Sequence, residues 1–193
     1  MTEALEVHPL TSERWDDLVA LFGPRGAVAG CWCMWWRETA REFEQNAGEA
    51  NREALRGVVE AGRVPGLLAY RGGRVIGWVS VAPREEFGRL ERSPTLGRVD
   101  EAPVWSVVCF YVARDERSSG VGSALLRAAV AHAEAHGARY VEGYPVDTGA
   151  TGRTGAGDIF TGVLSSFLDA GFREVARRSP KRPVVRLDLT GTG

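Results

Sequence analysis

The amino-acid sequence predicts an α/β protein made of one domain, residues 1–193, and three observations support this prediction. A length of 193 residues, of which 44% are hydrophobic and 25% charged, suits a single buried core. Short apolar runs bounded by glycine and proline are interleaved with stretches whose apolar residues recur every three or four positions. One apolar run, residues 104–112, leads through a glycine-bearing turn into a long helical stretch, residues 120–136.

The N-terminal part of the chain predicts one strand and two helices. Residues 5–9 are predicted to form a strand, and Thr11 or Ser12 can cap the helix that follows. The apolar residues of this helix are spaced i, i+3, i+4 and i+7, and they are Trp15, Leu18, Val19 and Phe22. Gly23-Pro24 ends it, and a second helix is predicted over residues 49–61.

The middle of the chain predicts a β-hairpin and a strand that leads into a helix. Residues 66–70 and 75–82 are predicted strands, joined by a turn at residues 71–74 that contains Gly72-Gly73. Residues 83–100 are polar, contain Pro83 and Pro94, and are predicted to be a loop. The strand at 104–112 and the helix at 120–136 follow, and Gly137 is well placed to end that helix.

The C-terminal part predicts a strand, a short helix and a final pair of strands. Residues 140–146 are the predicted strand, and the glycine-rich residues 148–157 are expected to be a mobile loop. Asp158 can cap a short helix that ends at Ala170-Gly171, with the apolar Phe172 after it. Residues 173–178 and 184–189 are the last two predicted strands.

Residues 117–122, Arg-Ser-Ser-Gly-Val-Gly, lie between the strand at 104–112 and its following helix. A strand that ends in such a turn directs several free backbone N–H groups and the positive end of the helix dipole at one place. Gly120 and Gly122 lack Cβ atoms where an anion would approach the backbone, and Arg117 adds a permanent positive charge. The turn therefore suits a phosphate or a pyrophosphate.

This arrangement resembles the GCN5-related N-acetyltransferase (GNAT) superfamily, whose signature is a strand ending in Val followed by Arg/Gln-x-x-Gly-x-Gly/Ala. Val112, Arg117, Gly120 and Gly122 fill those places, and the order of predicted elements over about residues 4–189 is that of the family. The resemblance implies a mixed central sheet flanked by helices, and acetyl-CoA as co-substrate. The residues that it assigns to acetyl-CoA are Phe110, Tyr111, Val112, Arg117, Ser118, Ser119, Gly120, Val121, Gly122 and Ser123.

The resemblance also implies direct transfer of an acetyl group to a primary amine, with the N–H of Val112 stabilising the oxyanion. Some members place a catalytic Glu six residues before the strand-end Val, and here that residue is Ser106. Many members place a Tyr that acts as the general acid four residues before a Gly-Phe pair, and in this chain that position holds Phe167. The hydroxyl of Ser165 or Ser166 could act in its place, directly or through a water. The candidate catalytic residues are therefore Val112, Ser106 and Ser166.

The absence of both usual acid/base residues leaves several mechanisms open. Glu101, Glu142 and Asp147 are carboxylates near predicted strand ends, but each is expected to be a solvated surface group. Catalysis could rest instead on positioning, on the oxyanion contact and on waters. A second hypothesis is an acyl-CoA-binding sensor or partner-binding module with little or no transferase activity. A third is a domain that binds another phosphorylated ligand at the same turn.

Residues 30–37, Gly-Cys-Trp-Cys-Met-Trp-Trp-Arg, place three tryptophans in a predicted loop. In the GNAT superfamily this region helps to form the acceptor site, so Trp32, Trp35 and Trp36 are candidate contacts for a small-molecule amine. The alternative is core packing, because tryptophan side chains are usually largely buried. Both interpretations stay open at this point.

The composition argues against several other function classes. A net charge of −1 provides no basic field for nucleic acid, and no stretch approaches the length of a membrane span. Cys31 and Cys33 are too close together, with no other ligand pair nearby, so no metal is expected. Three cysteines without a secretory signal indicate a cytoplasmic protein. The final strand pair could join a second copy in a homodimer.

Overall fold

The computed structural model describes residues 4–151 and 159–191, which form a seven-stranded sheet in the order β1-β2-β3-β4-β5-β7-β6. The strands are β1 (Leu5–Pro9), β2 (Gly66–Arg71), β3 (Arg74–Pro83), β4 (Trp105–Val112), β5 (Tyr140–Gly143), β6 (Arg173–Ala176) and β7 (Val184–Asp188). The α-helices are α1 (Trp15–Phe22), α2 (Ala40–Asn46), α3 (Glu49–Glu60), α4 (Gly88–Glu91), α5 (Val121–Ala135), α6 (Thr148–Thr151) and α7 (Leu164–Asp169). The predicted α/β class is confirmed.

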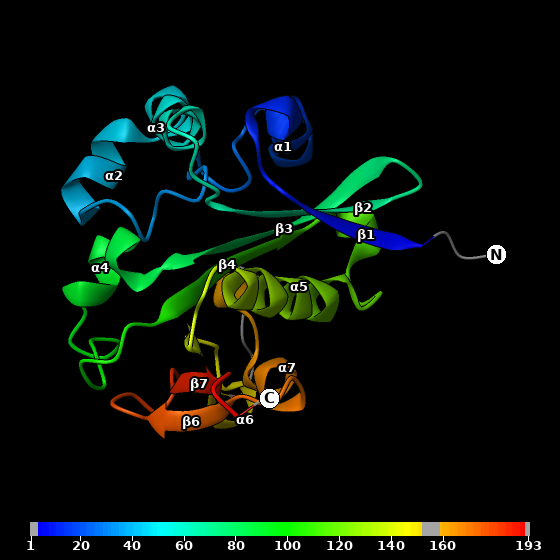
Figure 1. Ribbon diagram of the computed structural model, residues 1–193. Coiled ribbons are helices and arrows are strands. Elements are labelled where there is room, and N and C mark those ends of the chain that lie inside the picture. Colours follow the sequence, from blue (N-terminus) through cyan, green and yellow to red (C-terminus); the bar gives the residue numbers. More distant parts are fainter. Residues whose placement is uncertain (1–3, 152–158, 192–193) are drawn as a thin grey trace.

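Helices cover both faces of the sheet (Figure 1). Helices α1 and α3 lie on one face, where Trp15, Leu18 and Leu55 pack with the sheet residue Trp78. Helix α5 lies on the opposite face. Its buried stripe is Val121, Leu125, Leu126, Ala129 and Ala133, and it packs on residues of β2, β3 and β4. Burying both faces in this way is what the alternation of strands and amphipathic helices predicts.

The sheet is mixed, because β4 and β5 are parallel and every other neighbouring pair is antiparallel. The β2–β3 hairpin turns at Gly72 and Gly73, whose φ angles are 56° and 74°. Two successive left-handed residues are what a two-residue hairpin turn requires, so the predicted turn is confirmed. The β4–α5 unit returns to the sheet at β5, as the strand–helix–strand pattern predicts.

The predicted loop at residues 83–100 is partly wrong. It contains the 3₁₀ turn Arg84–Glu86 and the short helix α4, and Phe87, Leu90 and Leu96 are buried there. These residues form a third apolar cluster with Trp36, Ala82, Val108, Tyr144 and Val184. The cluster is not visible in the sequence, because its apolar residues are separated by charged ones and have no helical or strand period.

Three further elements differ from the prediction. Helix α2 is not predicted, because none of its residues is fully buried; the Thr39–Glu42 capping box is the signal that marks it. Strand β5 ends at Gly143 rather than at residue 146, and Pro145 has no N–H to continue a ladder. Helix α7 begins at Leu164, because Gly162 adopts φ 85° and interrupts the helix. The predicted cap Asp158 and most of the predicted glycine-rich loop lie outside the described residues.

Candidate functional site

The two parallel strands β4 and β5 pair over a short distance only. Within the described residues, β5 pairs with residues 105–107 of β4 and with none of residues 108–112. Val108 is an extra residue in the pairing of β4 with β3, since Ser80 pairs with Cys109 and Val81 with Val107. A bulge of this kind bends a strand and increases its twist. The pairing of β4 with β5 ends at this bulge.

The backbone of β4 directs two N–H groups to the edge that β5 leaves unpaired. Ala113 donates its N–H to the carbonyl of Ile76 on β3 at 2.8 Å. Successive residues of a strand point their N–H groups to opposite edges, so Val112 and Phe110 direct theirs away from β3. The carbonyl of Val112 faces the same way and accepts from Nε of Arg117 at 3.4 Å. The structure thus places a possible donor at Val112 beside the start of the turn.

The turn after β4 forms a concave run of backbone before α5. Ser118 and Gly120 adopt left-handed conformations, with φ angles of 66° and 82°. Alternating backbone conformations of this type bring successive N–H groups together into a nest that suits an anion. Gly120 precedes α5 without any side-chain cap, and the first turn of α5 contains no acidic residue. The N–H groups at the start of α5 have no acceptor within the helix.

Gly122 has no structural reason to be glycine. It lies in α5 outside the left-handed region, and a Cβ atom built there would meet no atom within 4 Å in the described structure. Glycine in a helix costs about 1 kcal/mol relative to alanine. Open space at the N-terminus of a helix, kept at that cost, fits a ligand that approaches the backbone closely.

Glu116 holds the turn against the β2–β3 hairpin. Its side chain is largely buried and accepts from Arg71 and, at 2.9 Å, from Arg74. Ser119 donates its hydroxyl to the carbonyl of Glu116 at 2.7 Å. The sequence analysis misses this anchor, because Arg71 and Arg74 are 45 and 42 residues away along the chain and no local pattern links them to Glu116.

A family model described as the acetyltransferase (GNAT) family matches residues 28–151, which is more than half of the chain and includes β4, the turn and the start of α5. The chain belongs to the GNAT family. This is a family of acetyl-CoA-dependent acyltransferases, so the predicted family, fold and enzyme class are confirmed. A search of curated proteins found no match.

Solved structures of GNAT proteins share the fold. The N-acetyltransferase of Staphylococcus aureus Mu50 has a TM-score of 0.58 at 13% identity and covers 97% of this chain and 99% of its own. The PaiA N-acetyltransferase of Thermoplasma acidophilum, solved in complex with coenzyme A, has a TM-score of 0.55 at 13% identity, and the match covers 96% of this chain and 99% of that one. A GCN5-related N-acetyltransferase of Kribbella flavida has a TM-score of 0.55 at 20% identity, and the match covers 96% of this chain and 98% of that one. At these identities the likeness concerns the fold alone.

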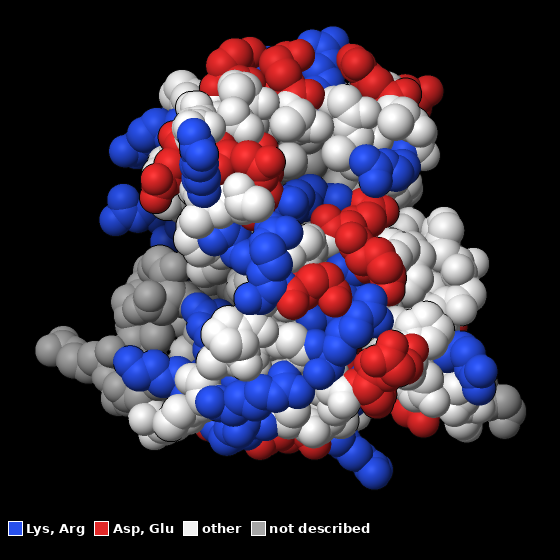
Figure 2. Space-filling model, turned by 90° about the vertical axis from the view of Figure 1, so that its left-hand side faces the viewer, with Lys and Arg blue, Asp and Glu red and all other residues white. Residues whose placement is uncertain are grey.

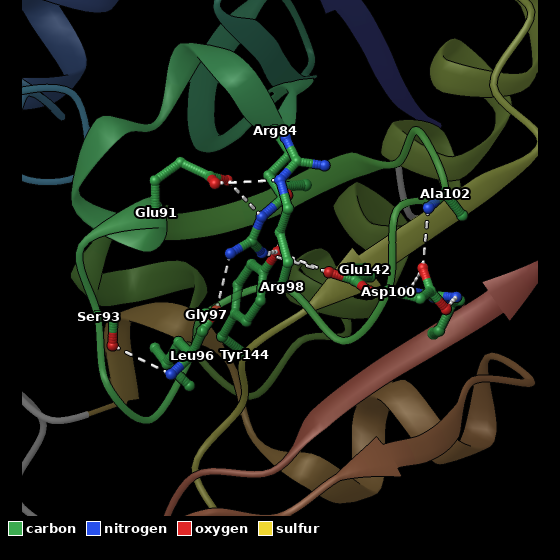
Figure 3. A network of polar contacts seen from close by, with 12 residues as sticks. Arg84, Glu91, Ser93, Leu96, Gly97, Arg98, Asp100, Ala102, Glu142 and Tyr144 are labelled. Atoms are coloured by element: carbon green, nitrogen blue, oxygen red, sulfur yellow. Dashed lines mark hydrogen bonds and ion pairs between the residues drawn. The ribbon is translucent and has the colours of Figure 1, made fainter.

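The other end of β4 lies in a buried polar network (Figure 3). Ser106 is fully buried, and its hydroxyl lies 2.8 Å from that of Tyr144. The Tyr144 hydroxyl also accepts from Arg84 at 2.6 Å and donates to Glu142 at 3.1 Å. Burial, followed by the charge of Glu142, raises the pKa of Tyr144 well above its usual range. Ser106 is therefore a member of this network.

Glu142 corrects one expectation from the sequence, because it is buried rather than solvated. Its side chain is 1% exposed and pairs with Arg84 at 3.4 Å and with Arg186 at 2.7 Å. The Glu142 carboxylate is thus held in charge-assisted contacts within the buried network. Asp147, the second substitute, pairs with Arg177 at 2.9 Å, and this hydrogen bond lowers its pKa below the usual range.

Phe167, at the place of the usual tyrosine, is buried in the core of the protein. Its ring lies against the backbone of Gly143 and near Gly162, and it forms an edge-to-face contact with Phe110, with 6.2 Å between ring centroids. Ser166 is the preceding residue of α7 and is half-buried, whereas Ser165 is exposed. Of these three residues, Ser166 combines a hydroxyl with partial burial, and it adjoins Phe167, whose ring contacts Phe110 of β4.

The three candidate tryptophans do not lie together. Trp32 is buried among residues of α1, stacks on Trp15 with centroids 6.3 Å apart, and lines a pocket of about 440 Å³ with Arg52. Trp35 is 38% exposed, and Trp36 is buried in the third apolar cluster. Both Trp35 and Trp36 line a different pocket, of about 370 Å³. Core packing accounts for Trp32, and the acceptor hypothesis now concerns Trp35 and Trp36.

The face that carries α2, α4 and the loop after α4 shows basic and acidic side chains interspersed in small groups (Figure 2). Many of these charges pair, as Arg98 does with Glu85 and Glu91. In the described ranges no three His, Cys, Asp or Glu side chains are grouped as a metal site would need. In the same ranges no helix is both long enough and apolar enough to cross a membrane.

Proposed function

We propose that this chain, acting as one domain, transfers an acetyl group from acetyl-CoA to the primary amine of a small molecule by direct attack. The observation that carries the proposal is the concave turn at residues 117–122, with its uncapped helix N-terminus and the open space at Gly122. The pyrophosphate of acetyl-CoA binds the N–H groups of this turn, and Arg117 contributes charge. The pantetheine arm lies along residues 110–112, at the edge that β5 leaves unpaired.

In the reaction, the lone pair of the neutral amine attacks the thioester carbon, so that a C–N bond forms and the C–S bond breaks. The N–H of Val112 stabilises the oxyanion that develops on the carbonyl oxygen. The ammonium proton passes to water. Ser166 passes a proton to the departing thiolate, directly or through a water, and regains one from the solvent that took the amine's proton, so that CoA leaves as the thiol. Ser106 acts at a distance, by holding Tyr144 and thereby the start of β4.

A substitution at Gly122 tests the binding of acetyl-CoA. Gly122→Glu places bulk and negative charge where the pyrophosphate binds. We therefore expect acetyl-CoA affinity to fall by at least about a hundredfold, which corresponds to about 2.8 kcal/mol of binding free energy. Calorimetry with acetyl-CoA, CoA and ADP measures the affinity and separates a CoA site from a general nucleotide site. Gly57→Glu is the matched control, because Gly57 is also helical and open. Retained affinity in a folded Gly122→Glu variant would contradict the proposal.

A substitution at Ser166 tests the proposed acid. We expect Ser166→Ala to lower kcat by about a hundredfold or more with little change in KM, within the range typical of a general acid. Ser165→Ala is the control, because Ser165 is the exposed neighbour on the same helix. Equal rates for the two variants would remove Ser166 from the mechanism.

A second candidate function is an acyl-CoA-binding module with little or no transferase activity. It is favoured because neither of the usual acid/base positions holds a usable acid or base. Ser106 takes part in a buried hydrogen-bond network, and Phe167 is buried in the core. Release of free CoA thiol from acetyl-CoA, followed over time with and without amines, decides between the two. Tight binding without thiol release from any amine selects the binding module.

A further inference from the structure

A pocket of about 370 Å³ lies between the tryptophan segment, the start of α2 and the loop after α4. Its lining includes Trp35, Trp36, Arg89 and Arg92. Leu96 also lines it, and Leu96 and Trp36 both belong to the apolar cluster that contains Val108 of β4. The pocket is therefore bounded by the cluster that packs on the middle of β4.

Arg89 is fixed in this pocket by neutral groups. Its Nε donates to the carbonyl of Trp35, and its backbone N–H donates to the carbonyl of Trp36 at 3.1 Å. The guanidinium lies over the Trp35 ring, 3.8 Å from the centroid. Its Nη2 atom is buried and has no hydrogen-bond partner. A stacked guanidinium with an unused buried donor is ready to bind an anion.

Neither arginine of the pocket has an ion pair with a carboxylate in the described residues. Glu42 and Glu38 act on them only at longer range: Glu42 accepts from the backbone of Thr39, and Glu38 accepts from Asn46. Burial, and then the charge of Arg92, lower the pKa of Arg89 below its usual value.

The neighbouring arginines of the same segment behave differently. Arg84 pairs with Glu91 at 2.7 Å, and Arg98 pairs with Glu85 at 2.8 Å. In contrast, Arg89 contacts the Trp35 ring in place of a carboxylate. The indole Nε1 of Trp36, another residue that lines the pocket, is also buried without a hydrogen-bond partner. Buried donors without partners are costly unless a ligand satisfies them.

We propose that this pocket binds the anionic group, a carboxylate or a phosphate, of the amine acceptor, with Arg89 and Arg92 as its ligands and Trp35 as the packing surface. The inference rests on the proposed function and narrows its acceptor to small amines that carry an anion. Arg89 and Arg92 then determine specificity and take no part in acetyl transfer itself.

Matched amines test this specificity. Amino acids are compared with their carboxamides, and O-phosphoethanolamine with ethanolamine, by CoA thiol release from acetyl-CoA. We expect the wild-type protein to prefer the anionic member of at least one pair by about tenfold or more in kcat/KM, as a charge-assisted contact predicts. That ratio should fall by about tenfold in Arg89→Gln and Arg92→Gln. The pair that responds tells a carboxylate from a phosphate.

Arg56→Gln is the control, because Arg56 lies on α3 and pairs there with Glu60. It should keep the wild-type ratio. Turnover of neutral and anionic amines at equal kcat/KM, or an unchanged ratio in Arg89→Gln, overturns the inference and leaves the proposed acetyl transfer intact.

A binding measurement decides the matter even if no amine is turned over, which would count against the proposed function instead. Calorimetry with O-phosphoethanolamine and with aspartate is done in the presence of CoA. Binding to the wild type and to Arg56→Gln that is lost in Arg89→Gln supports the pocket. No binding of either probe, or equal binding to Arg89→Gln, overturns it.

Discussion

The two ends of β4 are built in opposite ways. At its C-terminal end, Val112 leads into a turn of adjacent residues, in which Cβ atoms built at Gly120 and Gly122 would meet no atom within 4 Å in the described structure. At its N-terminal end, Ser106 is enclosed by side chains from distant segments, including Tyr144 and Arg84. A site made of backbone is recognisable as a short motif, whereas a site made of side chains depends on which segments the fold brings together. This difference explains why the turn at residues 117–122 is recognisable in the sequence and the buried network around Ser106 is not.

Each end also has its own ionic anchor. Glu116 ties the turn to the hairpin through Arg71 and Arg74, and it is shared with Ser119 of the turn itself. Arg84 ties the loop after β3 to β5 through Glu142 and Tyr144. If the two ends are as distinct as their structures suggest, breaking one anchor changes acetyl-CoA binding and breaking the other changes mainly stability.

The largest effect on stability is expected from Arg84→Met. Arg84 is 1% exposed, and its loss leaves the buried Tyr144 hydroxyl and the carbonyl of Leu96 without their donor. Removing one partner of a buried pair costs about 3–5 kcal/mol. Urea unfolding measures this loss.

Arg98→Met is the control, because Arg98 pairs with the same Glu91 from a more exposed position. Such a pair contributes less than about 1 kcal/mol. Equal losses for the two variants would mean that the buried network adds no stability of its own. A loss of acetyl-CoA affinity in Arg84→Met equal to that of Gly122→Glu would contradict the separation of the two ends.

A smaller loss of stability, with a change in binding, is expected from Glu116→Gln. Two arginines lose a charged acceptor, which costs about 1–3 kcal/mol. Because the turn is then held less firmly, we expect acetyl-CoA affinity to fall by about tenfold, which is 1.4 kcal/mol. Calorimetry and unfolding are compared with Asp115→Asn, whose carboxylate pairs with Arg74 but is 64% exposed. Unchanged affinity in Glu116→Gln would show that the turn needs no anchor.

The smallest effect concerns His132 on α5, whose ring packs against Trp105 at the start of β4. Burial, and then the charge of His136, lower the pKa of His132 below its ordinary value. The folded protein therefore binds this proton more weakly than the unfolded chain does. Above the ordinary pKa of about 6.5, His132 is neutral in both states, so the protein keeps its full stability. As the pH falls below that value, the unfolded chain takes up the proton more readily than the folded protein, so the unfolding free energy decreases.

His132→Gln removes this titration, so we expect the decline in unfolding free energy between about pH 7 and pH 5 to become shallower. Urea unfolding across this range measures the slope. A variant whose stability falls as steeply as that of the wild type would exclude His132 as its source.

The sequence by itself predicted the four strands β1 to β4 along the chain, the hairpin at Gly72-Gly73, helix α5 and the turn before it. Each depends on neighbouring residues: a periodic apolar stripe, two glycines that permit left-handed φ, or an uncapped helix start next to a strand. The turn at residues 117–122 belongs to this class, because contiguous backbone forms it.

Only the tertiary structure decided the burial of Glu142 and the separation of Trp32 from Trp35 and Trp36. It also decided which arginines lack a carboxylate partner, since Arg89 and Arg98 look alike in the sequence. Side-chain burial and charge pairing depend on contacts between segments far apart in the chain. No local pattern records such contacts, and the buried network around Ser106 and the pocket beside Trp35 consist almost entirely of them.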